Sequence, residues 1–350
     1  MIQRVFPKID LDELIKQKQR GLYSKNDFYR PISIAIQGNN YCSLGTCMGC
    51  GISAASKRNK ADELPKRVIL NLLKQAKTEG IFFYYTNFTG EITDDLDFFG
   101  KMLKENPKME AYKINTNCQK FTSIKAAEKI FKKLKKMGWT KTKYVSPICI
   151  LSSGMQQHKV PLKNIIYGMQ AFERVFEPAE ARLLISHYPT RVLYKDTLTE
   201  LKKLYRETFG KELDPSIIKN DPITRDGRAK ELPLTHFNPK RISEYILELN
   251  CFGHWHQKYV CPEIYVHRDY SIYTCPLFEP HKGLKIGDAK KDSLKTAIKN
   301  ANSNPFIREI AKGGTKRIYK KLIKKFPELK EIKVTNRHEA CKVLWEYFEK

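Results

Sequence analysis

The chain has 350 residues, of which 41% are hydrophobic and 29% are charged. This balance predicts a globular protein with a sizeable core, and charged residues interrupt every apolar run before it reaches the roughly 20 residues of a membrane span. The formal net charge of +26 favours acidic partners such as nucleic acid or acidic proteins, although lysines on solvated helix faces also explain it.

The amino-terminal segment, MIQRVFPKIDLDELIKQ, has no apolar h-region and no small-residue cleavage site, which a secretory signal requires. The nine cysteines are an odd number, and a chain of this size does not need disulfides to fold. We therefore expect a cytoplasmic protein whose thiols are reduced and whose clustered cysteines serve metal or redox chemistry.

Predicted strands alternate with predicted amphipathic helices over most of the chain. The helices carry apolar residues at spacings of three and four. This alternation predicts right-handed βαβ units and a parallel sheet, here an α/β fold with a partial (β/α)6 barrel whose chemistry gathers at the carboxyl ends of its strands. The strands are expected at 31–37, 81–88, 111–117, 144–152, 181–188 and 216–224, and the helices at 64–77, 94–105, 123–137, 162–176 and 198–209.

The alternation stops near Arg241. From Cys251 onward, two short β-like runs are joined by HRDY, and lysine-rich helices follow. We predict a helical extension over residues 1–30, the barrel over 31–240, and a small α+β domain with carboxyl-terminal helices over 241–350.

Three of the nine cysteines lie in one glycine-bearing loop directly after the first predicted strand: Cys42, Cys47 and Cys50. A structural zinc site needs four ligands, and no histidine precedes His158, so zinc would require a distant fourth ligand. Three unrelated core cysteines rarely crowd such a loop. A 4Fe–4S cluster held by three thiolates, with one iron open to an outside ligand, fits this pattern best.

With these cysteines the sequence resembles the radical S-adenosylmethionine (radical SAM) superfamily, over residues 31 to about 300. That family carries a three-cysteine motif after the first strand of a partial barrel, and the open iron chelates S-adenosylmethionine. The usual spacing is three and two residues with an aromatic before the last cysteine. Here the spacing is four and two, Gly49 stands at the aromatic position, and Gly45 can absorb the extra residue.

The turn after the second predicted strand extends the resemblance. The family has a glycine–glycine–glutamate–proline turn there, which receives the methionine amino group, and this chain has TGEI with Gly90 and Glu91. An ammonium group needs carbonyls and a carboxylate around it, and glycine lets the backbone come close. A plain β-turn with a solvated glutamate is the alternative.

The next two strand ends carry further candidates for cofactor contacts. The third strand ends INTNCQ, which resembles a threonine–asparagine–glycine strand end with Cys118 in place of the glycine. Asn115 and Asn117 alternate with apolar residues there and are expected to face the barrel interior. Ser152 and Ser153 end the fourth strand, where the family often binds ribose or the methionine carboxylate; an ordinary serine-rich turn is the alternative.

Two more positions follow from the same resemblance. His187, in the fifth strand, lies near a position that often touches the cofactor, although a buried structural histidine is an equal alternative. The segment DPITRDGRAKEL is similar to one in peptide-modifying members, which implies that backbone near Ile223 packs on adenine.

The region from Cys261 to Cys275 predicts a β-hairpin with a cysteine at each end. It resembles the SPASM and twitch domains, which hold auxiliary 4Fe–4S clusters, although Tyr270 stands where a glycine is usual and no later C-x-x-C pair exists. One auxiliary cluster and a cluster-free domain are both open. The cluster's ligands would be Cys251, Cys261, Cys275 and Cys341, with His254, His256 or His267 able to replace a thiolate.

The resemblance implies a radical SAM enzyme, which reductively cleaves S-adenosylmethionine to a 5′-deoxyadenosyl radical that abstracts hydrogen from a substrate. A ribosomally synthesised peptide or protein is the expected substrate, with RNA or a small molecule as alternatives. An acidic ferredoxin or flavodoxin suits the charge as electron donor. A different class is also open, namely a metal-stabilised, basic nucleic-acid-binding protein without catalysis.

Overall fold

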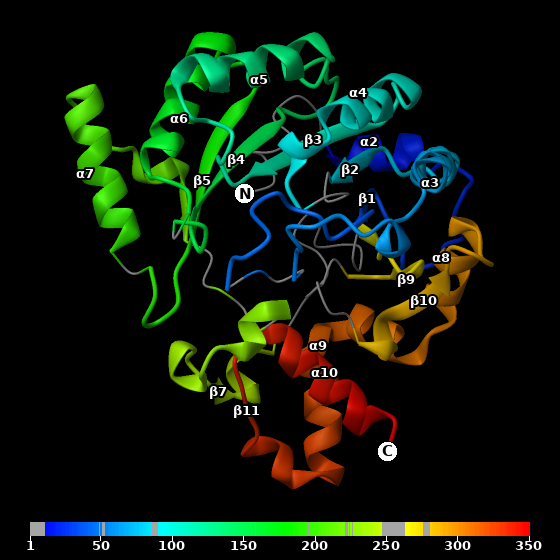
Figure 1. Cartoon of the computed structure of the whole chain (residues 1–350). Coiled ribbons are helices and arrows are strands. Elements are labelled where there is room, and N and C mark those ends of the chain that lie inside the picture. The colour runs from blue at the N-terminus through cyan, green and yellow to red at the C-terminus, as the bar shows by residue number, and fades with distance from the viewer. Residues whose placement is uncertain are drawn as a thin grey trace.

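The central element of this computed structural model is one nine-stranded sheet, in the order β10-β9-β8-β1-β2-β3-β4-β5-β6 (Figure 1). The structure describes residues 11–48, 50, 53–85, 90–157, 159–194, 196–220, 223, 225, 227–246, 263–275 and 281–350. Within these ranges a second, two-stranded sheet pairs β7 (Lys240–Arg241) with β11 (Lys333–Val334).

Strands β1 to β6 lie side by side in chain order, and every neighbouring pair is parallel. This confirms the predicted α/β class with a largely parallel sheet. The strands are β1 (Ser33–Ile36), β2 (Phe83–Tyr85), β3 (Glu110–Thr116), β4 (Ile148–Gly154), β5 (Arg182–Tyr188) and β6 (Ile218–Asn220). The helices between them are α3 (Lys66–Thr78), α4 (Leu96–Glu105), α5 (Ile124–Lys136), α6 (Lys163–Val175) and α7 (Thr197–Phe209).

Strand β4 begins later than the sequence predicts. The buried Glu110 carboxylate accepts hydrogen bonds from the backbone amides of Tyr144 (3.0 Å to Oε2) and Val145 (3.1 Å). Because these two amides already donate to a side chain, they do not donate to a neighbouring strand. The strand begins only at Ile148.

The helices form where the sequence places an apolar stripe and a cap. In α5 the hydroxyl of Ser123 accepts a hydrogen bond from the Ala126 amide (3.2 Å), which caps the helix. Ala127, Phe131 and Leu134, at spacings of four and three, are buried against the sheet side. Burying each large apolar side chain stabilises the fold by roughly 1.5–3 kcal/mol.

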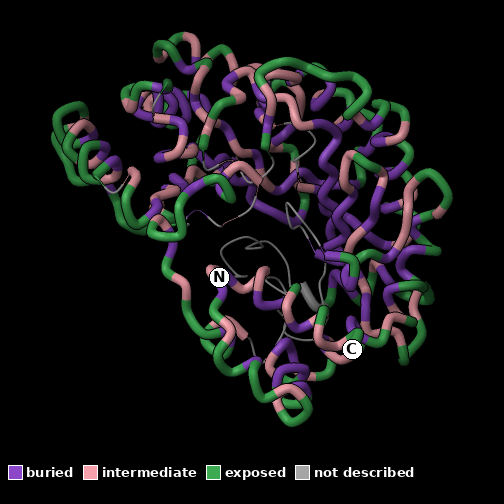
Figure 2. The backbone as a smooth tube through the Cα atoms, turned by 60° about the horizontal axis from the view of Figure 1, so that its bottom comes forward, coloured by how far each residue is buried: buried purple, intermediate pink, exposed green. Residues whose placement is uncertain are grey.

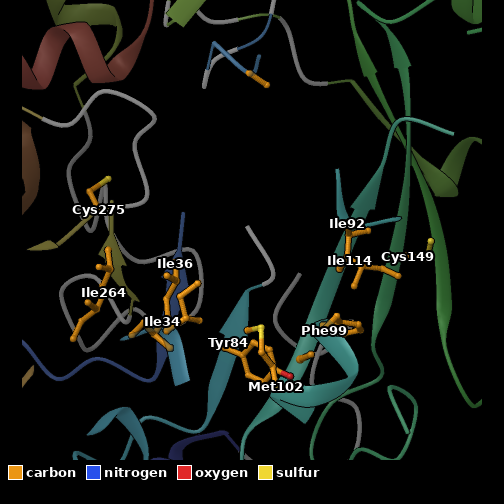
Figure 3. Packing of buried hydrophobic residues seen from close by; sticks show 14 of the residues in the cluster. Ile34, Ile36, Tyr84, Ile92, Phe99, Met102, Ile114, Cys149, Ile264 and Cys275 are labelled. Carbon is orange, nitrogen blue, oxygen red and sulfur yellow. The ribbon is translucent and has the colours of Figure 1, made fainter. Parts of the chain in front are cut away.

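The main core lies between the sheet and these helices. Figure 3 shows Ile34, Ile36 and Tyr84 of the sheet with Phe99 and Met102 of α4, all in one buried cluster. Buried positions follow the sheet, and exposed positions lie on the outer sides of the helices (Figure 2). The sheet is therefore the rigid element from which the loops at its carboxyl edge extend.

The carboxyl-terminal strands extend the same sheet. Strand β8 (Glu263–Val266) runs parallel to β1, with Ser33 paired to Glu263. It forms an antiparallel hairpin with β9 (Ser271–Tyr273), as predicted, and β10 (Lys285–Asp288) follows. Strands β8 to β10 thus continue the sheet of β1 to β6. The domain boundary expected at 240/241 stays a prediction.

The carboxyl-terminal helices contact the segment that precedes β1. Asn302 Oδ1 accepts hydrogen bonds from the amides of Phe28 and Tyr29, both 2.9 Å, and ties the amino-terminal segment to α8. No described helix is long and apolar enough to cross a membrane. The remaining helices are α2 (Leu11–Lys18), within the predicted extension, α8 (Leu294–Ser303), α9 (Pro305–Lys325) and α10 (Arg337–Phe348). The short 3-10 helices are η1 (Lys60–Asp62), η2 (Ile92–Asp94), η3 (Pro215–Ile217), η4 (Gly227–Glu231), η5 (Leu234–His236), η6 (Ile242–Glu244), η7 (Lys282–Leu284) and η8 (Pro327–Lys330).

Candidate functional site

The cysteine loop leaves the carboxyl end of β1 and closes on itself. The Cys42 amide donates to the Ala55 carbonyl (3.0 Å), and the Ala55 amide donates to the Asn40 carbonyl (2.7 Å). Gly45 has φ +53, and a Cβ there would overlap the backbone nitrogen of Ser56. Glycine is therefore required at this extra position of the loop, as both the backbone conformation and the close approach exclude a side chain.

The three loop cysteines are free thiols; Cys42 is buried, and Cys47 and Cys50 are half-buried. Burial raises the pKa of Cys42 to about 11. Burial, and then the neighbouring Cys50 and Cys42 thiols, raise the pKa of Cys47 to about 12. The Cys50 and Cys42 thiols therefore lie near enough to Cys47 to oppose its ionisation, and a bound cation would reverse that effect.

The donor set of this loop fits a thiolate-bound metal in residue type and neighbourhood. Within the described ranges, however, no three His, Cys, Asp or Glu side chains are arranged to hold a metal ion. Cys50 Sγ accepts a hydrogen bond from the Ala54 amide (3.3 Å). Such amide–sulfur contacts tune thiolate-bound clusters.

Gly90 packs the turn after β2 against the cysteine loop. Its amide donates to the Tyr41 carbonyl (2.8 Å). A Cβ at position 90 would lie 2.7 Å from Tyr41 O and 2.8 Å from the Cβ of Cys42, both closer than real Cβ atoms come. The loop and the turn meet only because this residue has no side chain.

The Glu91 carboxylate is buried and fully engaged by the protein. Oε1 accepts from the Thr93 amide (3.1 Å) and hydroxyl (2.8 Å), and Oε2 accepts from the Asn117 amide (2.7 Å). Burial raises the pKa of this carboxyl, and the hydrogen bonds oppose that rise. The glutamate thus joins η2 to the end of β3, and it is not the solvated turn residue of the alternative interpretation.

The end of β3 lies beside the cysteine loop. Asn117 Nδ2 is 3.5 Å from Cys42 Sγ, and its Oδ1 accepts from the Gln119 amide (2.9 Å). Cys118 has φ +63, the left-handed region that favours glycine, which is the residue the resemblance expects there. Asn115 lies two residues earlier, within β3, and donates to the Tyr85 hydroxyl (2.7 Å).

The contact of the loop with Asp94 was missed by sequence reasoning. The Ser43 amide and hydroxyl donate to the two oxygens of Asp94, at 2.8 and 2.9 Å, and Asp94 pairs with Lys120 at 2.8 Å. In the sequence Asp94 reads only as the start of a helix, so no local signal marks this contact.

The serine and histidine candidates at the other strand ends divide between the two sides of the sheet. Ser153 and His187 are register partners and are 0% and 2% exposed. Strand alternation puts them on the side of Leu151 and Ile185, which belong to the helix-packed core. Their Oγ and Nδ1 atoms have no hydrogen-bond partner among the described residues, and burial lowers the pKa of His187. Ser152 lies half-buried on the opposite side.

The segment after β6 reaches the cysteine loop through Arg228. Ile223 itself is buried in a small cluster with Ala229, Leu232 and Phe237, and its amide donates to the Pro189 carbonyl (3.0 Å). Arg228, to which the sequence alone assigns no role, donates to carbonyls of the loop and lowers the pKa of Cys47 against the larger effect of burial.

The predicted auxiliary-cluster ligands are only partly described. Cys251, Cys261, His254 and His256 lie outside the described residues. His267 pairs with Asp269 (3.0 Å) at the hairpin turn, and Cys275 is buried just after β9. Buried Cys341 on α10 lies 3.3 Å from His281 Nε2, a partner that the sequence did not indicate.

Taken together, the described residues define an α/β protein whose largely parallel sheet carries a three-thiol loop at the end of β1, covered by the Gly90 turn and the Arg228 segment. No protein-family model matches the chain, and no curated protein matches it.

Solved structures similar to this chain include a crystal structure of HydG, described as a maturase of the [FeFe]-hydrogenase. The sequence identity is 16%, the TM-score is 0.35, and the match covers 63% of this chain and 50% of that chain. The chain therefore matches about half the length of that structure. This is a partial likeness of shape, and no functional argument rests on it.

Proposed function

We propose that this chain is a radical SAM enzyme that uses a 4Fe–4S cluster held by Cys42, Cys47 and Cys50. The observation that carries the proposal is the contact of Gly90 with Cys42, because it brings the turn after β2 onto the cysteine loop after β1. The left-handed backbone at Cys118 and Tyr270 supports it too, since the resemblance expects glycine at both positions.

When bound, the cluster would supply one electron to the sulfonium of S-adenosylmethionine, whose sulfur–C5′ bond breaks to give methionine and a 5′-deoxyadenosyl radical that takes a hydrogen atom from the substrate. The residues of the chain bind and orient the cofactor and exclude water. Asn117 stands beside Cys42, and the Gly90 backbone lies against the loop. The proposed cofactor contacts are Gly90, Glu91, Asn115, Asn117, Ser152 and Ile223. Ser153 and His187 rest on the resemblance alone, because they lie on the helix-packed side of the sheet.

The proposed substrate is a ribosomally synthesised peptide or protein, and the proposed electron donor is an acidic ferredoxin or flavodoxin. The segment around Arg228 and the hairpin β8–β9 support the substrate class through their resemblance to peptide-modifying members. The net charge of +26 supports an acidic donor and an acidic peptide alike, since complementary charge speeds encounter.

The proposed auxiliary cluster rests on Cys251, Cys261, Cys275 and Cys341. Cys341 is buried in the apolar core cluster with Ala340 and Leu344, and His281 is a polar neighbour of its thiol. Iron and sulfide counts on a Cys341→Ala variant test this, because loss of one cluster is expected while the loop cluster stays. An unchanged count means that Cys341 is not a required ligand of an auxiliary cluster.

The main test is anaerobic reconstitution of the full chain with iron and sulfide. We expect the charge-transfer absorption of a 4Fe–4S cluster, and 5′-deoxyadenosine after addition of dithionite and S-adenosylmethionine. Replacing Cys42, Cys47 and Cys50 together by alanine should abolish both, whereas Cys149→Ala, a thiol fully buried in β4, should keep them. Stoichiometric zinc with no iron-dependent cleavage, together with salt-dependent binding to RNA or DNA, would instead identify a nucleic-acid-binding protein.

A further inference from the structure

Arg228 contacts the cysteine loop at three carbonyl groups. Its backbone amide donates to Cys50 O (3.1 Å). Its guanidinium donates through Nη1 to Cys47 O (3.2 Å) and through Nη2 to Ala54 O. One residue therefore spans the stretch that carries two of the three loop cysteines, although it lies far from them in the sequence.

The segment that carries Arg228 is itself firmly placed. Ala229, the next residue, is 0% exposed in a cluster with Leu232 and Phe237, packed against Tyr188 at the end of β5. The Arg191 amide donates to His236 O (2.9 Å), which fastens the loop after β5 to η5. Arg228 is thus anchored to the β5 side of the sheet and reaches across to the loop that leaves β1.

The chemistry of the contact calls for arginine. A guanidinium is planar and presents several N–H donors in a fixed fork, so it can bind two separate carbonyls at once. A lysine ammonium is a compact point charge on a flexible stem and holds no such geometry. The guanidinium also places a permanent positive charge beside the loop, and local charge is one of the factors that set the potential of an iron–sulfur cluster.

We infer that Arg228 is a positioning residue, which fixes the spacing of Cys47 and Cys50 by fastening their loop to the β5 side of the sheet. This structural role of Arg228 does not depend on which metal the loop binds. Its redox part, a reduction potential held up by the fixed charge, rests on the proposed function. The experiment therefore needs one measurement without metal and one with the cluster.

The first measurement uses the full chain without metal. Hydrogen exchange of peptides covering residues 42–56 is compared in the wild type, Arg228→Gln, Arg228→Lys and Arg191→Gln. The last is the control, since Arg191 is an exposed cation in the adjoining loop. Losing the two guanidinium hydrogen bonds should speed exchange about 5- to 160-fold in Arg228→Gln. Arg228→Lys should also exchange faster, and the control should match the wild type.

The second measurement is the reduction potential of the reconstituted protein, followed by the EPR signal of the reduced cluster. In Arg228→Gln we expect the reduction equilibrium to fall about tenfold, which is about 59 mV for one electron, whereas Arg228→Lys should keep most of the potential because it keeps the charge. If the protein forms no iron cluster, the proposed function fails while the exchange measurement still decides the positioning role.

The positioning role is overturned if residues 42–56 exchange at the wild-type rate in Arg228→Gln. It is also overturned if they do so in Arg228→Lys, because the forked guanidinium would then be unnecessary. If Arg228→Gln unfolds and exchanges faster everywhere, Arg228→Lys decides: faster exchange confined to residues 42–56 supports the inference, and none overturns it. An unchanged potential in Arg228→Gln overturns the redox part alone.

Discussion

The backbone of Gly90 packs against the side chain of Cys42, and a methyl group added to Gly90 would come 2.8 Å from the Cβ of Cys42 and 2.7 Å from Tyr41 O. Gly90→Ala must therefore push the turn and the loop apart. We expect the substitution to cost about 1–3 kcal/mol of stability and to lower iron loading of the reconstituted protein.

Urea unfolding and iron content measure the effect of Gly90→Ala. Gly100→Ala on α4 is the matched control, because the added methyl meets only the flexible Met137 side chain, at 3.0 Å or more. Wild-type stability and iron content in Gly90→Ala would contradict the packing role.

Glu91→Gln separates a structural role from a ligand role. The carboxylate accepts three hydrogen bonds through both oxygens, and an amide nitrogen accepts none. We expect a loss of about 1–3 kcal/mol in the free energy of unfolding without metal, while Glu105→Gln, an exposed residue of α4, should have little effect. Unchanged stability with S-adenosylmethionine affinity reduced roughly tenfold or more would show that Glu91 serves the cofactor alone.

The His281–Cys341 contact predicts acid sensitivity of the α10 packing. Burial, and then Lys342, lower the pKa of His281 to about 3, whereas an unfolded imidazole titrates near 6.5. Below about pH 6.5 the unfolded chain binds a proton at His281 that the folded chain does not bind. The contribution of neutral His281 to stability is therefore complete above that pH and is lost as pH falls towards 3.

The measurement is urea unfolding at several pH values between 7 and 4. Between about pH 6 and 4 the wild type should lose about 1.4 kcal/mol per pH unit more than His281→Gln, because one proton is taken up on unfolding. Parallel pH dependence in the two proteins would show that His281 is not held neutral.

At Tyr270 we expect glycine to be more stabilising than alanine, the reverse of the usual order. Its φ is +71 at the hairpin turn, where its amide donates to His267 O (2.9 Å). Tyr270→Gly should be about 1 kcal/mol more stable than Tyr270→Ala, since both lose the ring and only glycine adopts this conformation freely. At Lys299, an exposed position inside α8, alanine should be the more stable. Thermal unfolding of the four variants compares glycine with alanine at each position. If the alanine variant is the more stable one at both positions, the backbone of Tyr270 is not strained.

The strand and helix order follows from local pattern, whereas the long-range contacts do not. Alternating buried strands and amphipathic helices are enough to predict the parallel sheet β1–β6. The start of β4 was misplaced because a distant carboxylate, that of Glu110, takes the amides that would have opened the strand. The parallel pairing of β8 with β1 has no local signal, because it joins segments from opposite ends of the chain.

The candidate site divides in the same way. The cysteine loop and the Gly90 turn could be predicted because each is a short motif after a strand. The contacts of Arg228 and Ser43 could not, because each depends on a partner placed by the fold. For Glu91 the motif was recognised, but its burial and its bonds to Thr93 and Asn117 emerge only when β3 lies beside the turn.

The pairing of β1 between β2 and β8 also bears on how the molecule is made. While the chain is being synthesised from its amino terminus, β1 and its loop can gain β2 early, but one edge of β1 stays open until residues 263–266 have emerged. An open strand edge recruits unintended partners, and domains generally form as units during synthesis. A nascent chain with the cysteine loop already translated thus waits until residues 263–266 have emerged before the strand beneath that loop is paired on both sides.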